Sequence, residues 1–163
     1  MNALPKTGRI LVVDDEESTR TTLHDYLTGI GYDVVTAADG KEALKKFDPG
    51  AFDCVISDLI MPEIDGIELL KRLRVEDGDV FFLMITGFPG LDSAVNAMKE
   101  GAYDYIVKPF HMDDMRLKVE RALHVKKTEA SLKRVKGLFL SCIVLIPVLV
   151  SLGIIFGIFW KDR

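Results

Sequence analysis

The sequence predicts an α/β fold in which a five-stranded parallel sheet is covered by helices on both faces. Five short apolar runs alternate with five segments whose apolar residues recur at helical spacing. Runs that are apolar throughout are typical of strands buried on both faces, and parallel strands need helical crossovers between them. Neither a repeat nor a low-complexity tract interrupts the first 125 residues. We therefore expect one domain at residues 9–125, after an extension at 1–8.

The N-terminal part of this domain carries two strand–helix pairs. RILVV predicts a strand at 9–13, and the acids of 14–17 favour the first turn of a helix, whose dipole they complement. Apolar spacing continues this helix up to Gly31, a glycine cap. YDVVT predicts a strand at 32–36, and a short helix around 43–47 ends before a Pro-Gly pair.

The third pair is organised around an acid at a strand end. FDCVIS predicts a buried strand at 52–57 that stops at Asp58. Pro62 forbids simple continuation of a strand or a helix, and a turn at 65–66 precedes a helix that closes near 77–78. For an isolated aspartate, a turn or helix-cap role would be the simpler interpretation.

The last two pairs complete the alternation. VFFLMI predicts a strand at 80–85 that ends at Thr86, and a helix follows at 91–100. YDYIV predicts a strand at 103–107, and the final amphipathic helix starts near residue 113.

Polar side chains follow four of the predicted strands where each strand ends: Asp14 and Asp15, Asp58, Thr86, and Lys108. Because the carboxyl ends of parallel strands share one edge of a sheet, these side chains should converge. Three neighbouring carboxylates repel one another unless a cation shares the site, and hard oxygen ligands favour Mg²⁺. A lysine and a hydroxyl aimed at the same spot suit an anion, most simply a phosphoryl group on Asp58. The alternative, a set of unrelated strand-end caps, requires four coincidences.

At these positions the sequence resembles the receiver domain of two-component response regulators. The resemblance rests on VVDDEE at 12–17, D-x-x-M-P-x-x-D-G at 58–66, Thr86-Gly87, and Y-x-x-K-P-F at 105–110. The segment 84–110 is most similar to receivers that precede enhancer-binding transcriptional activators. The resemblance implies a flavodoxin-like, doubly wound (βα)5 fold with the strand order 2-1-3-4-5.

The resemblance also implies the phosphoacceptor and its metal ligands. Asp58 would accept a phosphoryl group from a histidine kinase or a phosphotransfer protein. Asp15, Asp58 and the backbone carbonyl of Ile60 would bind Mg²⁺ directly, and Asp14 would act through water.

The same resemblance assigns a switch. Thr86 would hydrogen-bond a phosphoryl oxygen, and Lys108, followed by a cis bond to Pro109, would pair with Asp58 and then with the phosphoryl group. Tyr105 would swing inward when Thr86 moves, and would signal to an unknown downstream protein at the face of the fourth helix, fifth strand and fifth helix. A surface aromatic on a strand is the alternative for Tyr105.

Two apolar residues border the path of the water that would hydrolyse a phosphorylated Asp58. In the family these positions lie two residues after the phosphoacceptor and two after the threonine, here Ile60 and Phe88. Neither side chain can orient water by hydrogen bonding, so we expect a long-lived phosphoryl group.

Composition limits the partners of the domain. Acidic residues outnumber basic ones by 25 to 21, and the excess lies before residue 126. This is not the composition of a nucleic-acid-binding protein, so no nucleic-acid partner is expected. Cys54 and Cys142 lie in apolar runs without metal-site spacing, and the N-terminus has no signal-peptide core, which favours a cytoplasmic domain.

The C-terminal part has a different character. A basic segment at 126–136 precedes residues 137–160, which contain no charged residue, and a short tail at 161–163 follows. As a helix, with a rise of about 1.5 Å per residue, 137–160 would cross a hydrocarbon core of about 30 Å. The excess of basic residues before the span places the domain inside. Gly153-x-x-x-Gly157 allows the close helix approach of a homodimer, with lipid-facing glycines as the alternative. A buried core helix or an oligomer interface is the alternative.

The sequence as a whole predicts a single-pass protein of the inner, cytoplasmic membrane whose receiver domain faces the cytoplasm. We expect it to lack a DNA-binding output domain and to act by phosphorylation-dependent partner binding or by phosphorelay. It should not be an enzyme beyond its own phosphotransfer and slow autodephosphorylation. One alternative is a structural membrane protein that uses the domain as a dimerisation scaffold. Another is a Mg²⁺-dependent aspartyl-phosphate phosphohydrolase, which would require an acid where Ile60 stands.

Overall fold

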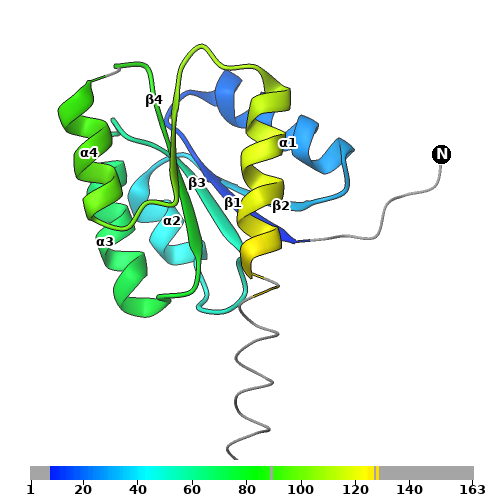
Figure 1. Ribbon diagram of the computed structural model, residues 1–163, viewed down its shortest axis with the longest axis horizontal. Coiled ribbons are helices and arrows are strands. Elements are labelled where there is room, and N and C mark those ends of the chain that lie inside the picture. The colour runs from blue at the N-terminus through cyan, green and yellow to red at the C-terminus, as the bar shows by residue number, and fades with distance from the viewer. Residues whose placement is uncertain (1–7, 89, 127, 129–163) are drawn as a thin grey trace, which may run out of the picture. The chain divides into compact units, whose positions relative to one another are not determined.

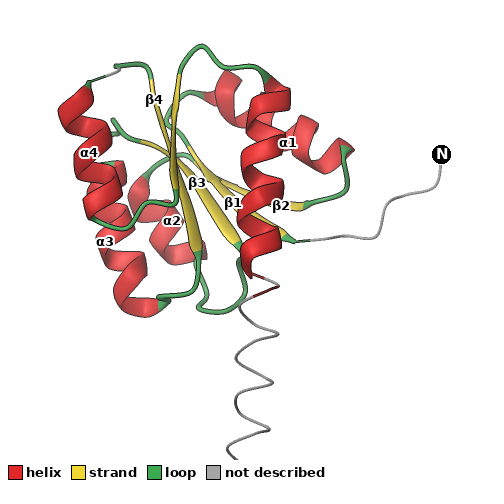
Figure 2. Cartoon of the chain, viewed as in Figure 1, coloured by secondary structure: helices red, strands yellow, loops and turns green. Residues whose placement is uncertain are grey.

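The computed structural model describes residues 8–88, 90–126 and 128. Strands and helices alternate through this part of the chain (Figures 1 and 2). The strands are β1 (Arg9–Val13), β2 (Asp33–Ala37), β3 (Cys54–Asp58), β4 (Phe81–Thr86) and β5 (Asp104–Val107). The helices are α1 (Glu17–Gly29), α2 (Gly40–Lys46), α3 (Gly66–Glu76), α4 (Leu91–Lys99) and a further helix at 112–126.

The strands form one parallel sheet in the order β2-β1-β3-β4-β5. Each neighbouring pair is parallel, with Ile10 opposite both Val34 and Cys54, and Asp58 opposite Ile85. The predicted five-stranded, doubly wound α/β fold and its strand order are therefore confirmed. From β1, the next strand along the chain is added on one side and β3 on the other. Sheets of this kind bind their ligands at the point between β1 and β3 where the strand order reverses.

Helices cover both faces of the sheet (Figure 2). On one face, Ile10, Val12 and Ile56 pack with Leu23 of α1 and Met115 of the 112–126 helix. On the other face, alternate strand residues pack against α2, α3 and α4; they include Leu11, Val55 and Met84. Strand side chains therefore alternate between two apolar layers, and each fully buried aliphatic side chain contributes about 1.5–3 kcal/mol.

The start of α1 differs from the prediction. Asp14, Asp15 and Glu16 lie in the β1–α1 loop, and the helix begins at Glu17. In this loop the Glu16 N–H donates to Asp14 Oδ1 at 2.9 Å, which forms a local turn before the helix. At the other end, α1 stops at Gly29, and Gly31 lies beyond it with a φ of 103°, a left-handed conformation that favours glycine.

The β3–α3 loop is fixed by two glycines. A Cβ on Gly66 would lie 2.4 Å from the Asp58 carbonyl oxygen and 2.7 Å from Met84 Sδ. A Cβ on Gly40 would lie 2.7 Å from Cβ of Ile64, which is in the loop itself. Asp65 caps α3 by accepting the Glu68 N–H. This close packing determines where Asp58, at the start of the loop, can lie.

The predicted basic segment at 126–136 and the predicted span at 137–160 lie, apart from Lys126 and Thr128, outside the described residues. By its contacts the chain divides into the units Met1–Lys126 and Lys127–Arg163, and the sheet belongs to the first. Among the described residues, no helix is both long enough and apolar enough to cross a membrane.

Candidate functional site

The predicted site residues lie at the carboxyl ends of four strands or directly after them. Asp58 and Thr86 are the last residues of β3 and β4, whereas Asp14 and Lys108 follow β1 and β5 directly. Asp14, Asp58 and Thr86 are buried. The convergence expected of the strand ends is therefore present in the structure.

Both oxygens of Asp58 are engaged. Oδ1 accepts the Ile60 N–H at 3.0 Å, and Oδ2 accepts Lys108 Nζ at 2.5 Å. The residue as a whole is only 7% exposed. Lys108 also donates to Asp14 Oδ2 at 2.7 Å, so one ammonium group joins the two buried carboxylates.

A third carboxylate completes an acidic cluster. One oxygen atom each of Asp14, Asp15 and Asp58 lies within 4.8 Å of the others, and Asp15 is exposed. Three convergent carboxylates with an open, solvent-facing side fit Mg²⁺, a cation that keeps several waters. The described contacts of Ile60 involve its N–H, so its predicted role as a carbonyl ligand stays a prediction.

The ionisation of the cluster reflects burial and the shared lysine. Burial raises the pKa of the Asp14 carboxyl above its usual value, although hydrogen bonds from Lys108 and the Glu16 N–H act to lower it. Burial of Lys108 works to lower its pKa, but the hydrogen bonds to Asp14 and Asp58 outweigh this and raise the pKa. Lys108 therefore stays charged, and Asp14 is the acid whose charge is costly without a cation.

The β4–α4 loop holds the hydroxyl of the site. Thr86 is buried, and its Oγ1 accepts the Phe88 N–H at 3.1 Å. A Cβ on Gly87, the next residue, would meet nothing within 4 Å apart from its chain neighbours, so the backbone at Gly87 has open space around it. Phe88 is 73% exposed and Ile60 is 53% exposed, so both predicted water-access residues are open to solvent.

Tyr105 is tied to α4 through a residue that has no place in the sequence motif. Its hydroxyl lies 3.1 Å from Ser93 Oγ, which itself donates to the Gly90 carbonyl at 2.8 Å. Because the single Ser93 hydroxyl proton is used on Gly90, the Tyr105 hydroxyl is the donor to Ser93. Tyr105 is half-buried in this arrangement, and its predicted role as a switch stays a prediction.

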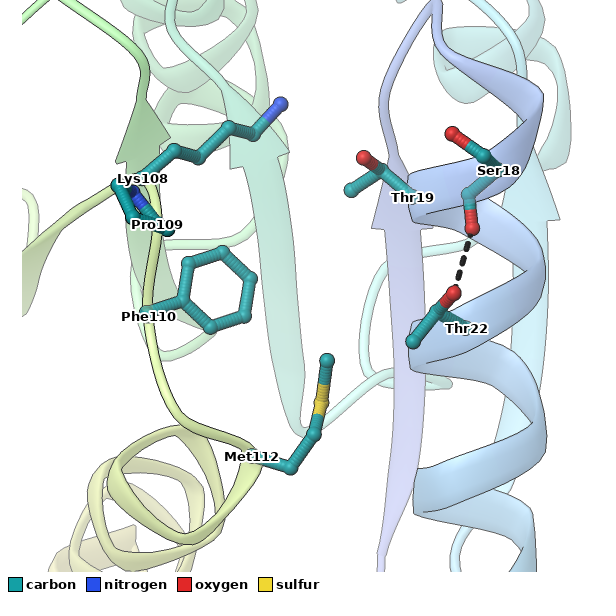
Figure 3. Close-up of a pocket in the computed structure, with 7 residues that line it drawn as sticks. All are labelled: Ser18, Thr19, Thr22, Lys108, Pro109, Phe110 and Met112. Carbon is teal, nitrogen blue, oxygen red and sulfur yellow. Dashed lines mark hydrogen bonds between the residues drawn. The ribbon is translucent and has the colours of Figure 1, made fainter.

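A pocket of about 280 Å³ opens beside the site, between α1 and the β5–helix loop. Figure 3 shows three hydroxyl side chains of α1 facing Lys108, Pro109, Phe110 and Met112 across the pocket. The predicted cis bond between Lys108 and Pro109 is present. One wall therefore offers hydroxyl groups and the other an apolar surface that ends at the site lysine.

Sequence reasoning missed Arg20 and Ser93. Arg20 Nη1 donates to the Asp14 backbone carbonyl at 2.6 Å, and Ser93 contacts Tyr105 as described. No sequence signal marks either contact, since each depends on where a helix lies relative to a loop or a neighbouring strand. Cys54, which belongs to no motif, is buried as its apolar run predicted. Burial raises the pKa of its thiol to about 12.

Comparison with known proteins gives one consistent result. Residues 10–120 match the family described as response regulator receiver domain. The chain is 41% identical over 122 residues to the transcriptional regulatory protein ZraR of Klebsiella oxytoca, which covers 74% of this chain. The match spans only 28% of the length of that relative.

Solved structures agree. A CheY-like response regulator receiver domain protein of Methanospirillum hungatei JF-1 is 30% identical, with a TM-score of 0.72, over 77% of this chain and 99% of that one. NtrX of Brucella abortus, solved in complex with ATP, is 33% identical, with a TM-score of 0.74, over 78% of this chain and 29% of that one.

Proposed function

The chain belongs to the response regulator receiver domain family, and from this premise we propose that Asp58 accepts a phosphoryl group from a histidine kinase or a phosphotransfer protein. The observation that carries the proposal is the position of Asp58, whose carboxylate contacts the Lys108 ammonium and lies within 4.8 Å of two further carboxylates. A strand-end acid held in this way is positioned for group transfer rather than for packing.

The proposed step is a phosphoryl transfer between two residues. An oxygen of Asp58 attacks the phosphorus of a phosphohistidine, the P–O bond forms, the P–N bond breaks, and the histidine nitrogen leaves with its electron pair and takes up a proton. Mg²⁺, when bound by the carboxylates, offsets charge on the phosphoryl oxygens.

The side chains around Asp58 take defined parts in this proposal. Lys108 must release Asp58 Oδ2, to which it donates at 2.5 Å, and then pairs with a phosphoryl oxygen. The Thr86 hydroxyl, which accepts a backbone N–H in the present arrangement, donates its proton to a second phosphoryl oxygen. The space beside Gly87 accommodates the group.

The pocket of Figure 3 supports a protein donor. It runs from α1 to Phe110 and ends at Lys108, so a helix laid along it brings a histidine to the mouth of the site. Its apolar wall of Pro109, Phe110 and Met112 offers contact area that a small phosphodonor would not use. The proposed chemistry ends with the phosphoryl group on Asp58, which then leaves either by slow hydrolysis or by transfer to another protein.

We further propose that Thr86 and Tyr105 transmit the state of Asp58 to a downstream protein. Movement of Thr86 toward the phosphoryl group frees space that Tyr105 fills after it leaves Ser93. The receiving surface consists of α4, β5 and the 112–126 helix, where Leu91, Val95 and Leu117 are exposed. A phosphorelay, in which Asp58 passes its phosphoryl group on, uses the same site.

The uncharged residues 137–160 support a second proposal, that the domain is tethered to the inner face of the cytoplasmic membrane. The basic segment at 126–136 would then lie near anionic headgroups.

The phosphoacceptor is tested with Asp58→Asn, which keeps the shape of the side chain and removes the nucleophilic charge. Incubation with labelled acetyl phosphate or a phosphorylated histidine kinase should label the wild type in a Mg²⁺-dependent, acid-stable and base-labile form, as acyl phosphates behave, and should not label the variant. Asp39→Asn, at the cap of α2, is a matched control that should label fully. Full labelling of the Asp58 variant would refute the assignment.

A further inference from the structure

Asp15 differs from the other carboxylates of the cluster because no partner fixes its side chain. Asp14 and Asp58 each contact Lys108 and a backbone N–H. Within the described residues, Asp15 makes no side-chain hydrogen bond or ion pair, and it is exposed, yet one of its oxygens lies within 4.8 Å of oxygens of the other two. The backbone of the β1–α1 loop therefore directs this carboxylate into the cluster.

Arg20 holds that backbone. Its Nη1 donates to the Asp14 carbonyl oxygen at 2.6 Å, across the first turn of α1. This carbonyl belongs to the peptide group that joins Asp14 to Asp15. Because a peptide group is planar, its orientation also fixes the direction in which the chain enters Asp15. A hydrogen bond from a guanidinium is charge-assisted and stronger than a neutral one.

The two cations near the cluster act on different atoms. Lys108 takes one carboxylate oxygen from each of Asp14 and Asp58. Arg20 contacts a carbonyl and leaves every carboxylate oxygen available. Its own N–H donates to the Glu16 carbonyl at 3.1 Å, which anchors the residue to the same loop. Arg20 can thus hold the loop while a metal ion occupies the carboxylates.

We propose that Arg20 is a positioning residue for divalent-cation binding, which directs Asp15 toward the ion by fixing the Asp14–Asp15 peptide group. The inference rests on the proposed function only in that both involve Mg²⁺, and cation binding is measurable without any phosphodonor. Groups that orient metal ligands change metal affinity by about 10-fold or more when they are removed.

The test measures Mn²⁺ binding to the purified full chain. Binding is measured by titration calorimetry and, independently, by the electron paramagnetic resonance signal of the free ion. Arg20→Gln should weaken binding about 10-fold. Arg20→Lys, whose ammonium can reach the carbonyl, should recover part of the loss. Arg72→Gln removes the same charge from an ion pair with Glu68 on α3 and should bind as the wild type does.

The sign of the effect separates positioning from electrostatics. Loss of a positive charge near the cluster would by itself tighten cation binding. Unchanged or tighter Mn²⁺ binding by Arg20→Gln would therefore overturn the inference, as would a wild type that binds no Mn²⁺. The melting temperature in EDTA identifies a variant that fails to fold, in which case Arg20→Lys decides.

Phosphorylation gives an independent readout. The rate of labelling of Arg20→Gln by acetyl phosphate should return to the wild-type rate at saturating Mg²⁺, because only the affinity for the ion is lowered. A wild type that binds Mn²⁺ but takes no label would refute the proposed function and leave the role of Arg20 standing.

Discussion

Asp14 combines burial, a like-charged neighbour and a single ammonium partner, and the balance raises its pKa above the ordinary value of 3.8. The folded protein therefore holds a proton on Asp14 more tightly than the unfolded chain does. Folding stability consequently falls, relative to an uncharged replacement, as the pH rises through the pKa of the folded state. Burial of the charged Asp14 carboxylate lowers folding stability, and a bound cation would offset this cost.

Asp14→Asn should accordingly raise the melting temperature at pH 7 in EDTA by a few degrees, and the gain should vanish below about pH 3.8, where both states are protonated. Excess Mg²⁺ should reverse the order, because the ion stabilises only a folded chain that binds it. Calorimetric scans from pH 3 to pH 8, with and without Mg²⁺, check this. A variant that is less stable than the wild type at pH 7 in EDTA would contradict it.

Ile60 and Phe88 make the mouth of the site apolar, and both are open to solvent. A polar side chain at either position can orient the water that attacks the phosphorus, so Ile60→Asn or Phe88→Asn should speed loss of the label several-fold without preventing phosphorylation. The measurement is decay of labelled protein in Mg²⁺ buffer. Val75→Asn exchanges an apolar residue near the end of α3 that is more exposed than either, and it should leave the decay unchanged.

At the scale of elements, the junction between β3 and α3 controls the geometry of Asp58. Gly66 is the first residue of α3 and packs against the Asp58 carbonyl, with no room for a side chain. Gly29, at the end of α1, has open space around it, since a Cβ there would meet nothing within 4 Å. Gly66 is therefore required by packing, whereas nothing packs against Gly29. Substituting the two glycines distinguishes a packing effect from an effect on backbone freedom.

Gly66→Ala should lower the free energy of unfolding by about 1–3 kcal/mol, because the new methyl group must displace backbone and Met84 Sδ. Gly29→Ala should raise it by about 0.5–1 kcal/mol, as expected for alanine in an open helical position. Urea unfolding followed by circular dichroism measures both. Equal effects of the two substitutions would show that α3 can shift away from Asp58 without cost.

The elements could be read from the sequence because each strand is an apolar run bounded by turn residues. The strand ends then located Asp58, Thr86 and Lys108, since the edge of a parallel sheet collects them. The start of α1 could not be read, because acids favour both a first helical turn and a preceding loop. The contacts of Arg20 and Ser93 could not be predicted either, because each residue contacts a main-chain or side-chain oxygen that only the folded arrangement brings near.

At the scale of the whole molecule, the domain and the segment after it differ in how many charged residues they can expose to water. The described domain buries apolar residues on both faces of a sheet and leaves charged helices outside. Residues 137–160 have no charged position with which to face water.

Truncation after Lys136 should therefore release a soluble domain that is still labelled on Asp58, whereas the full chain should sediment with membranes and resist carbonate. A full-length control, Ile146→Asp with Leu149→Asp, keeps the chain length but raises the free energy of membrane insertion by about 6–8 kcal/mol, and this variant should be released from the membrane as the truncated chain is. Fractionation and labelling are measured on the same samples. Carbonate-resistant sedimentation of the truncated chain would place the anchor before residue 137, and an unlabelled truncated chain would show that the segment supports the site.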